Sequence, residues 1–115
     1  MKIEVRGRNI EVTPELRDAV MKRFERTGQQ VSDQATLHVE LLEERNPSIA
    51  DRCVAEALLA LKGVTINAWE ASPEMLHSIH ELAEDVRRRV KKHREKQRKR
   101  SRTRKLMARL RANSA

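Results

Sequence analysis

Aromatic side chains are nearly absent from this 115-residue chain, which contains Phe24, Trp69 and no tyrosine. Proteins that hold single-stranded RNA by stacking its bases need several exposed aromatic rings. The sequence therefore argues against a base-stacking platform. An RNA partner would have to be held through its phosphate backbone and its shape.

Cysteine and glycine are also scarce. Cys53 is the single cysteine, so the chain cannot form an internal disulfide, and we expect this residue to fill a small apolar position in the core. The 3 glycines form no phosphate-binding loop, and no nucleophile lies beside a base. The 4 histidines are scattered, without a second ligand pair at a confirming spacing. We therefore predict no enzymatic activity, no metal site and no cofactor.

Long apolar runs are missing too. No stretch approaches the roughly 20 apolar residues that a membrane span requires. The first nine residues, MKIEVRGRN, have neither the apolar segment nor the cleavage site of a secretory signal. We expect a cytoplasmic protein that does not insert into a membrane.

Positive charge, in contrast, is abundant and gathered at one end. Residues 87–115 hold 15 of the 25 Lys and Arg side chains and one acid, Glu95, a net charge of +14. Residues 1–86 hold 10 basic and 16 acidic side chains, a net charge of −6. Such a basic block repels itself, so it is either a solvated tail or a surface for a polyanion. We favour the polyanion, because the charge exceeds what solubility requires.

The first half of the chain predicts a strand, a helix and a second strand. Residues 2–12 alternate between apolar and polar, which indicates a strand that bends at Gly7. Thr13-Pro14-Glu15 has the chemistry of a helix start, and Gly28 is expected to end that helix. Residues 35–42 alternate again, and a loop follows at 44–48.

Residues 52–61, RCVAEALLAL, fit two structures. Their alanines and leucines favour a helix, whereas alternation of Cys53, Ala55, Ala57, Leu59 and Leu61 fits a strand, and the segment alone does not decide. The tight Lys62-Gly63 connection and the alternating residues 64–69 favour a β-hairpin. In that hairpin Trp69 lies on the sheet face opposite the inward row, where we expect a partly shielded packing role.

A second helix is predicted to begin at Ser72-Pro73-Glu74, which repeats the chemistry of the first helix start. A core-facing stripe at helical spacing follows: Met75, Leu76, Ile79, Leu82, Ala83, Val86 and Val90. The core is expected to end near Val90. No proline or glycine follows Pro73, so the helix can continue into the basic block.

These elements predict an α+β fold with the order β-α-β-β-β-α. A four-stranded sheet would carry two helices packed on one face, followed by a basic C-terminal extension. We expect one domain at residues 1–96 and a tail at 97–115 that is disordered or helical when the protein is free, because no apolar residue anchors the chain between residue 96 and Leu106.

The chain resembles a bacterial family, the ribosome-associated inhibitors or hibernation-promoting factors. The resemblance covers residues 1 to about 96 and rests on IEVRGRNIEVTPELRDAV, LKGVTINAWEASPEMLHSI and RRRVKKHREK. It implies that residues 52–61 form a strand. It also implies a stress or stationary-phase factor that binds the small ribosomal subunit where messenger and transfer RNA would lie, and that stops translation.

The resemblance also implies which cations face RNA. Carried over by position, these are Lys22, Arg23 and Arg26 on the first helix and Arg88, Lys92 and Arg94 on the second. The chain departs from the family at Asp85, where a lysine is usual, at Ala19 and Leu76, where a tyrosine is usual, and at Asn67, where an arginine is frequent. Arg87, Arg89 and the long basic tail are candidates to replace these contacts. The rest of the basic block adds Lys91, Lys96, Arg98, Lys99 and Arg100 as candidate RNA-binding residues.

Three classes of function fit this charge distribution. The first is a translation inhibitor in the RNA channel of the small subunit, in contact with ribosomal RNA and neighbouring ribosomal proteins. The second is a general RNA-binding or RNA-annealing protein, and the third is a module whose basic helix lies on an anionic membrane or an acidic protein. The acid-rich body favours the first, because bulk RNA would repel it except at its cationic positions. Weak apolar anchoring counts against the membrane.

We expect a monomer when the protein is free, acting on single ribosomes, since too few residues follow Lys96 for the dimer-forming domain of longer family members.

Overall fold

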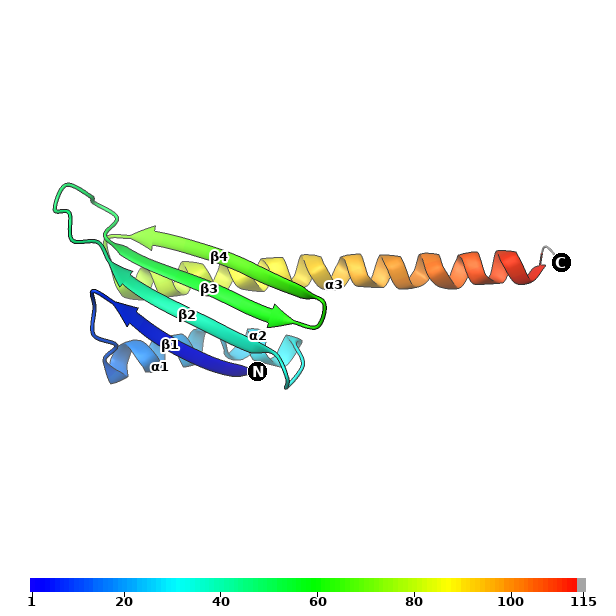
Figure 1. Cartoon of the computed structure of the whole chain (residues 1–115), viewed down its shortest axis with the longest axis horizontal. Coiled ribbons are helices and arrows are strands. Elements are labelled where there is room, and N and C mark those ends of the chain that lie inside the picture. Colours follow the sequence, from blue (N-terminus) through cyan, green and yellow to red (C-terminus); the bar gives the residue numbers. More distant parts are fainter. Residues whose placement is uncertain (114–115) are drawn as a thin grey trace.

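Four strands form one sheet, in the order in which they occur in the chain (Figure 1). The computed structural model describes residues 1–113. The strands are β1 (Lys2–Arg8), β2 (Thr36–Glu43), β3 (Cys53–Leu61) and β4 (Val64–Ser72). β1 pairs with β2 in parallel, whereas β2 with β3 and β3 with β4 are antiparallel. The parallel pair requires a crossover, which the first helices supply.

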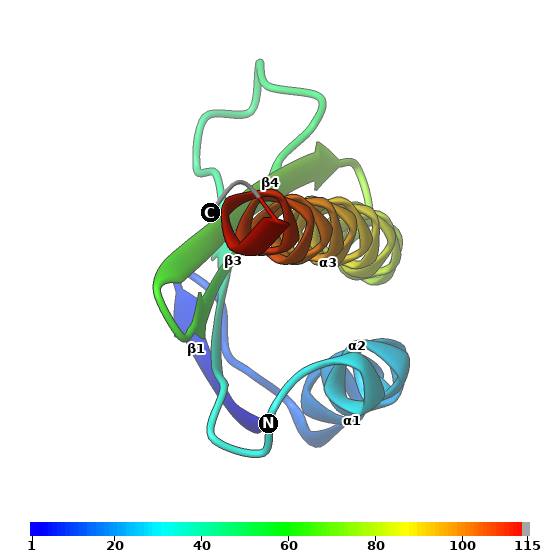
Figure 2. The same cartoon turned by 90° about the vertical axis from the view of Figure 1, so that its right-hand side faces the viewer.

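The helices are α1 (Pro14–Arg23), α2 (Glu25–Gln30) and α3 (Met75–Asn113), and all three lie on the same face of the sheet (Figure 2). This arrangement confirms the predicted fold class. α3 projects far beyond the sheet, so the molecule measures 70 × 28 × 17 Å. No helix within residues 1–113 has both the length and the apolar character needed to cross a membrane.

The core lies between the sheet and the helices, and strand register builds it. One cross-strand row joins Ile3, Leu37, Leu59 and Ile66 through the pairings of neighbouring strands. Leu37 and Leu59 are fully buried, whereas β1 at the sheet edge is only partly covered. Buried side chains of the helical segments complete the core on its other side: Phe24, Ile79, Leu82 and Val86.

The predicted strand 52–61 is confirmed as β3, which lies between β2 and β4. Ala55, Ala57 and Leu59 face the helices and are buried, whereas Glu56 and Leu58 are exposed on the outer face. The hairpin turn to β4 passes through Gly63, which has φ of 79°. Backbone hydrogen bonds to two neighbouring strands therefore hold this segment as a strand, although its alanines and leucines have a high helix propensity.

β1 is shorter than predicted. It ends at Arg8, and the chain turns at Asn9, whose φ is 59°, so residues 10–12 are not part of the strand. Ile10 packs against the core after this turn, and Val12 is partly buried. Gly7 permits the return, since a Cβ at this position would lie 2.3 Å from the carbonyl oxygen of Ile10.

The first predicted helix begins as expected but does not end at Gly28. Thr13 caps α1 by accepting a hydrogen bond from the Leu16 amide at 3.2 Å. The helix is interrupted at Phe24 and resumes as α2, which runs through Gly28 to Gln30. Phe24 and Thr27 are both buried, so the apolar side continues across the interruption and holds α2 on the core.

The second helix starts later than predicted. α3 begins at Met75, so Pro73 does not occupy its first position. The Ser72 hydroxyl accepts from the Glu74 amide at 3.3 Å and lies 2.6 Å from the Ser78 hydroxyl, which donates to the Cys53 carbonyl at 2.6 Å. These buried serines tie β3, β4 and the first turn of α3 together.

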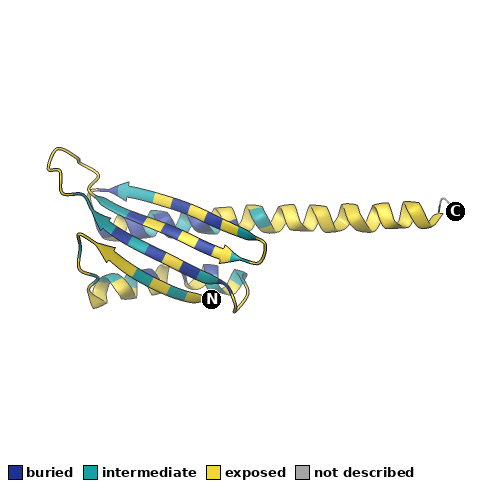
Figure 3. Cartoon of the chain, viewed as in Figure 1, coloured by how far each residue is buried: buried dark blue, intermediate teal, exposed yellow. Residues whose placement is uncertain are grey.

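The core stripe of α3 is confirmed except at Leu76. Its other predicted members are buried, but Leu76 is 48% exposed and Ser78 is buried in the stripe instead. Beyond Val90 almost every side chain is exposed (Figure 3). α3 crosses the proposed boundary at residue 96 without a break, and the division into a domain and a tail stays a prediction.

Trp69 does not have the shielded role that we expected. It lies on the outer sheet face, as predicted, but is 66% exposed, because the three helices of the described residues 1–113 all lie on the opposite face (Figure 2). On β3 its cross-strand neighbour is Glu56, which is also exposed.

Candidate nucleic-acid interface

The outward side of the first helices carries three of the predicted cations. Lys22 and Arg23 lie in the last turn of α1, and Arg26 lies in α2; all three are exposed. The buried Phe24 fixes this orientation, because its ring holds the opposite side of the segment on the core. These cations therefore face away from the sheet, on the helical side of the molecule.

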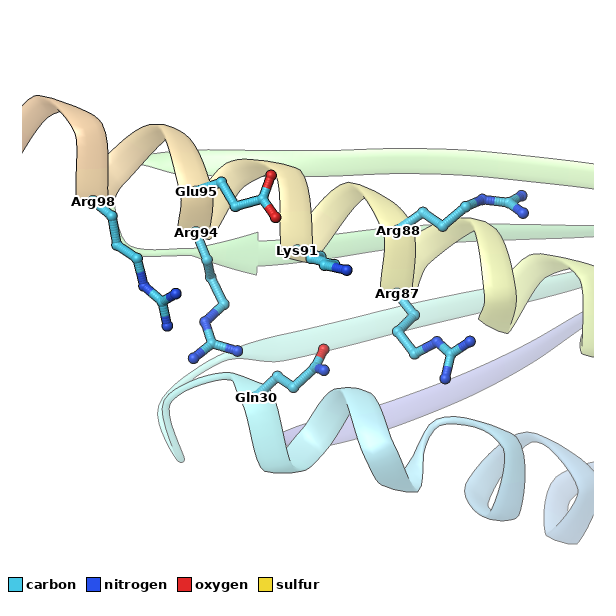
Figure 4. Close-up of a pocket in the computed structure, with 7 residues that line it drawn as sticks. All are labelled: Gln30, Arg87, Arg88, Lys91, Arg94, Glu95 and Arg98. Carbon is cyan, nitrogen blue, oxygen red and sulfur yellow. The ribbon is translucent and has the colours of Figure 1, made fainter.

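A groove between α2 and α3 gathers the largest group of predicted cations (Figure 4). It has a volume of about 490 Å³. Its lining residues are Gln30 from α2 and Arg87, Arg88, Lys91, Arg94, Glu95 and Arg98 from α3. Arg87, Lys91, Arg94 and Arg98 are spaced four, three and four residues apart, which places them on one side of a helix. The groove therefore holds five cations against one acid.

The other side of α3 carries a second cationic group beside the edge strand β4. Arg88, Arg89, Lys92 and Lys96 line a shallow hollow there, together with Asp85, His93 and two apolar residues of β4. Arg88 lines both this hollow and the α2–α3 groove. Arg88 therefore lies on α3 between the two cationic groups.

The structure thus separates the residues that the sequence grouped together. Of the three α3 cations implied by the family resemblance, Arg94 lies in the α2–α3 groove, Lys92 beside β4 and Arg88 between them. Lys99 and Arg100 line neither hollow, and both are exposed on the projecting part of α3. Lys22, Arg23 and Arg26 share the helical side of the molecule with the α3 cations but line neither hollow.

Two of the candidate arginines are held by acids of their own helix. The Arg87 Nη2 atom lies 2.6 Å from Glu84 Oε2, and the Arg89 Nε atom lies 3.0 Å from Asp85 Oδ1. The carboxylate of Asp85 is therefore neutralised locally, so the acid that replaces a usual lysine does not present an unpaired charge. The other candidate cations form no ion pair within the described residues 1–113.

Sequence reasoning missed Gln30, which reaches the groove only because α2 packs against α3. Its Oε1 atom is buried and has no hydrogen-bond partner within the described part of the chain. It also missed Arg102, Lys105 and Arg109, which continue the side of α3 that begins with Arg87. The three- and four-residue spacing of these cations could have identified them.

The rest of the chain, within the residues that the structure describes, offers no comparable chemistry. Burial, together with the carboxylate of Glu43, raises the pKa of the Cys53 thiol, so this residue is held in its neutral form. Its Sγ atom lies 3.6 Å from the Pro73 carbonyl oxygen. Within residues 1–113 no group of three or more His, Cys, Asp or Glu side chains is arranged to hold a metal ion.

Comparison with curated proteins identifies relatives that are named as ribosome hibernation factors. The chain is 26% identical over 102 residues to the ribosome hibernation promoting factor of Acinetobacter guillouiae, covering 84% of this chain and 90% of the relative. It is 30% identical over 101 residues to the ribosome hibernation promoting factor of Pseudomonas putida, with the same coverage. The ribosome hibernation promotion factor of Picosynechococcus sp. is 31% identical over 97 residues, which span 84% of this chain but half of that protein.

Solved structures share the fold, and a family match covers the domain. A ribosomal subunit interface protein from Coxiella burnetii superposes with a TM-score of 0.70 at 21% identity, covering 83% of this chain and 99% of that one. The N-terminal domain of Thermus thermophilus Protein Y gives 0.68 at 24% identity, covering 81% and 99%. Residues 3–98, which include nearly all of the sheet, α1, α2 and α3 as far as the α2–α3 groove, match the family described as Sigma 54 modulation protein / S30EA ribosomal protein. The chain belongs to this family.

Proposed function

We propose that this protein is a ribosome hibernation factor that occupies the channel of messenger and transfer RNA on the small ribosomal subunit and thereby stops translation. The observation that carries the proposal is the α2–α3 groove, which is lined by five cations and a single acid. A polyanion that enters this groove meets charge from one side of α3, and the proposed identity of that polyanion, ribosomal RNA, agrees with the names of the relatives.

The charge of the body favours a shaped RNA site over random strands. Residues 1–86 carry a net charge of −6, so most of their surface is repelled by RNA. Lys22, Arg23 and Arg26 are exposed exceptions in α1 and α2, the helices that lie on the same face of the sheet as α3 (Figure 2). An RNA surface must therefore match the placement of the helices to be bound closely, which a folded ribosomal channel can do.

The projecting part of α3 adds affinity in this proposal. Residues 97–113 carry eight cations and no acid, and they are tethered to a body that is already bound. Binding of the tail is then intramolecular, so its effective concentration near the RNA is high. The body selects the binding site, and the tail increases the affinity by binding along the path of the messenger RNA. We propose that the protein acts as a monomer on single ribosomes.

The experiment compares the full chain with a chain that ends at Lys96, in a translation assay and on sucrose gradients. The core ends at Val90, so the shorter chain retains every buried residue. We expect the full chain to inhibit translation more strongly and to leave ribosomes as single particles. Equal inhibition by both chains would remove the tail from the mechanism, and a peak of paired ribosomes formed by the full chain alone would contradict action on single ribosomes.

The alternative, a general RNA-binding protein, makes a different prediction in the same system. It would bind unrelated structured RNA as tightly as small subunits, because its affinity would come from phosphates alone. A competition assay between small subunits and such RNA separates the two functions. Under our proposal the unrelated RNA competes poorly at physiological salt.

A further inference from the structure

The projecting part of α3 carries an apolar strip that packs against nothing in the described structure. Leu106, Met107 and Leu110 are 56%, 46% and 54% exposed, respectively. Together with Thr103 they occupy positions i, i+3, i+4 and i+7, so they lie on one side of the helix. This spacing is the anchor pattern of helices that bind in apolar grooves of other proteins. We call these four residues the apolar strip.

Cations border the apolar strip on both sides. Arg98, Arg102, Lys105 and Arg109 lie about 120° around the helix from it, at 100° per residue, and continue the side that lines the α2–α3 groove. Arg100 and Arg104 border its other side, about 90° away. The end of α3 therefore has one apolar side, bordered by the cationic side that continues the α2–α3 groove and, on the other border, by Arg100 and Arg104.

We propose that the apolar strip docks in an apolar groove with an acidic rim on a ribosomal protein, while the cationic side that continues the α2–α3 groove remains on ribosomal RNA. The end of α3 would then lie at a boundary between RNA and protein. This inference rests on the proposed function, because it names a second component of the same ribosomal site. The chemistry of the partner follows from the strip and its border: aliphatic side chains need an apolar surface, and the guanidinium groups of Arg100 and Arg104, which border the strip away from the RNA-facing side, need carboxylates.

Other occupants fit this surface less well. RNA offers phosphates to the cationic side, but Leu106, Met107 and Leu110 have no aromatic ring on which a base could stack. A second copy of the same segment is disfavoured, because residues 96–113 carry nine cations and no acid, and two such helices would repel each other. A membrane needs a larger apolar face, usually with aromatic anchors, than three aliphatic residues provide.

The length of α3 lets both contacts form at once. The apolar strip, from Thr103 to Leu110, lies 13 to 20 positions beyond Val90, the last buried residue, which places it about 20 to 30 Å further along the helix axis. The body and the strip can therefore bind to different parts of one particle. Each contact then raises the effective concentration of the other.

Photo-crosslinking of the full chain on purified small subunits tests the proposal. The photoreactive residue p-benzoylphenylalanine replaces either Met107, within the strip, or Lys105, on the cationic side. We expect the probe at Met107 to crosslink one ribosomal protein, at a peptide rich in aliphatic and acidic residues, and the probe at Lys105 to crosslink ribosomal RNA. Crosslinks from Met107 to RNA or to a second copy of this chain, or no crosslink while Lys105 reacts, would overturn the proposal.

A matched pair of double variants gives a second test with a binding readout. Leu106→Gln with Leu110→Gln keeps a high helix propensity and the net charge. We expect it to weaken subunit binding about tenfold without changing the salt dependence of affinity. Arg102→Gln with Lys105→Gln should weaken binding and reduce the salt slope by about 1 per residue.

An unchanged affinity for the leucine variant would overturn the apolar contact while leaving ribosome binding intact. If the leucine variant bound small subunits as tightly as the unaltered chain but floated less with phosphatidylglycerol vesicles, the strip would be assigned to membranes instead. Failure of the unaltered protein to bind small subunits would reject the proposed function itself. The three results are distinguishable, because each is read from a different pair of samples.

Discussion

Arg89 lies one turn beyond Asp85 on α3 and donates a hydrogen bond to it, with Nε 3.0 Å from Oδ1. The Asp85 side chain is 15% exposed, so the carboxylate is largely covered by its surroundings and its partner. Glu84 and Arg87 form a similar pair on the groove side. Each pair removes one cation from the candidate interface and compensates one acid, which keeps the acids of α3 from repelling a bound polyanion.

The first prediction concerns this pair. Asp85→Asn removes the negative charge and leaves Arg89 free to reach a phosphate. A charge about 4 Å from a phosphate contributes about 1 kcal/mol in water, so affinity for small subunits should rise about fivefold at low salt. The Arg89 side chain is 54% exposed, so loss of this helical ion pair should cost about 1 kcal/mol of stability or less. Glu56→Gln on the outer sheet face is the control for net charge, and an equal gain in that variant would contradict a local role for Asp85.

The second prediction concerns the salt dependence of binding. If about 8 of the 15 cations in residues 87–111 contact phosphates, log K for small subunits should fall with log salt at a slope of about −6 to −7. Isothermal titration or filter binding between low and physiological salt measures this slope. A slope shallower than about −2 would show that the basic block mainly keeps the protein soluble.

The third prediction separates binding from stability. Arg88→Glu with Lys92→Glu should abolish subunit binding and change the free energy of unfolding by less than about 0.5 kcal/mol, because both side chains are exposed. Val86→Ala should do the reverse and cost about 1 to 2 kcal/mol, because Val86 is fully buried between α3 and the sheet. Chemical denaturation and sedimentation measure the two properties. If the double variant unfolded at the same denaturant concentration as the Val86→Ala variant, this result would show that the two cations support the fold.

The fourth prediction compares two glycines. Gly7→Ala should destabilise the protein by about 1 to 3 kcal/mol, because its Cβ would lie 2.3 Å from the Ile10 carbonyl oxygen and 2.9 Å from Val12 Cγ2. Gly28→Ala should be neutral or stabilising by up to about 1 kcal/mol, since Gly28 lies inside α2 and its nearest atom, Met1 Cε, would be 3.6 Å away. Equal melting temperatures for the two variants would contradict the tight return of the chain over β1.

The order and type of the elements were predictable because periodicity reports which side of an element is buried. Leu37, Val39 and Leu41 alternate in the sequence and are buried in β2. Segment ends were less predictable, since they depend on neighbours distant in the sequence. Gly28 has the chemistry of a helix end, yet α2 continues past it because Phe24 and Thr27 are buried. Ser72 has the chemistry of a cap, yet its hydroxyl bonds to Ser78 at the start of α3.

The candidate interface, like the fold, could be predicted from the sequence only in part. The charge block identified the cations, because their number and separation from the acids are visible in the sequence. Which cations act together depends on the phase of α3 and on what lies beside it. Arg94 and Lys92 are two residues apart, but one faces α2 and the other faces β4. Gln30 joins Arg94 in the groove only through tertiary packing.

The central claim is that the protein occupies the RNA channel of the small subunit. The most direct test is sedimentation of the purified full chain with purified small subunits, either empty or already loaded with messenger and transfer RNA. The account predicts that the protein travels with empty subunits and that loaded subunits exclude it. Equal retention by empty and loaded subunits would contradict this account, because it would place the protein outside the channel.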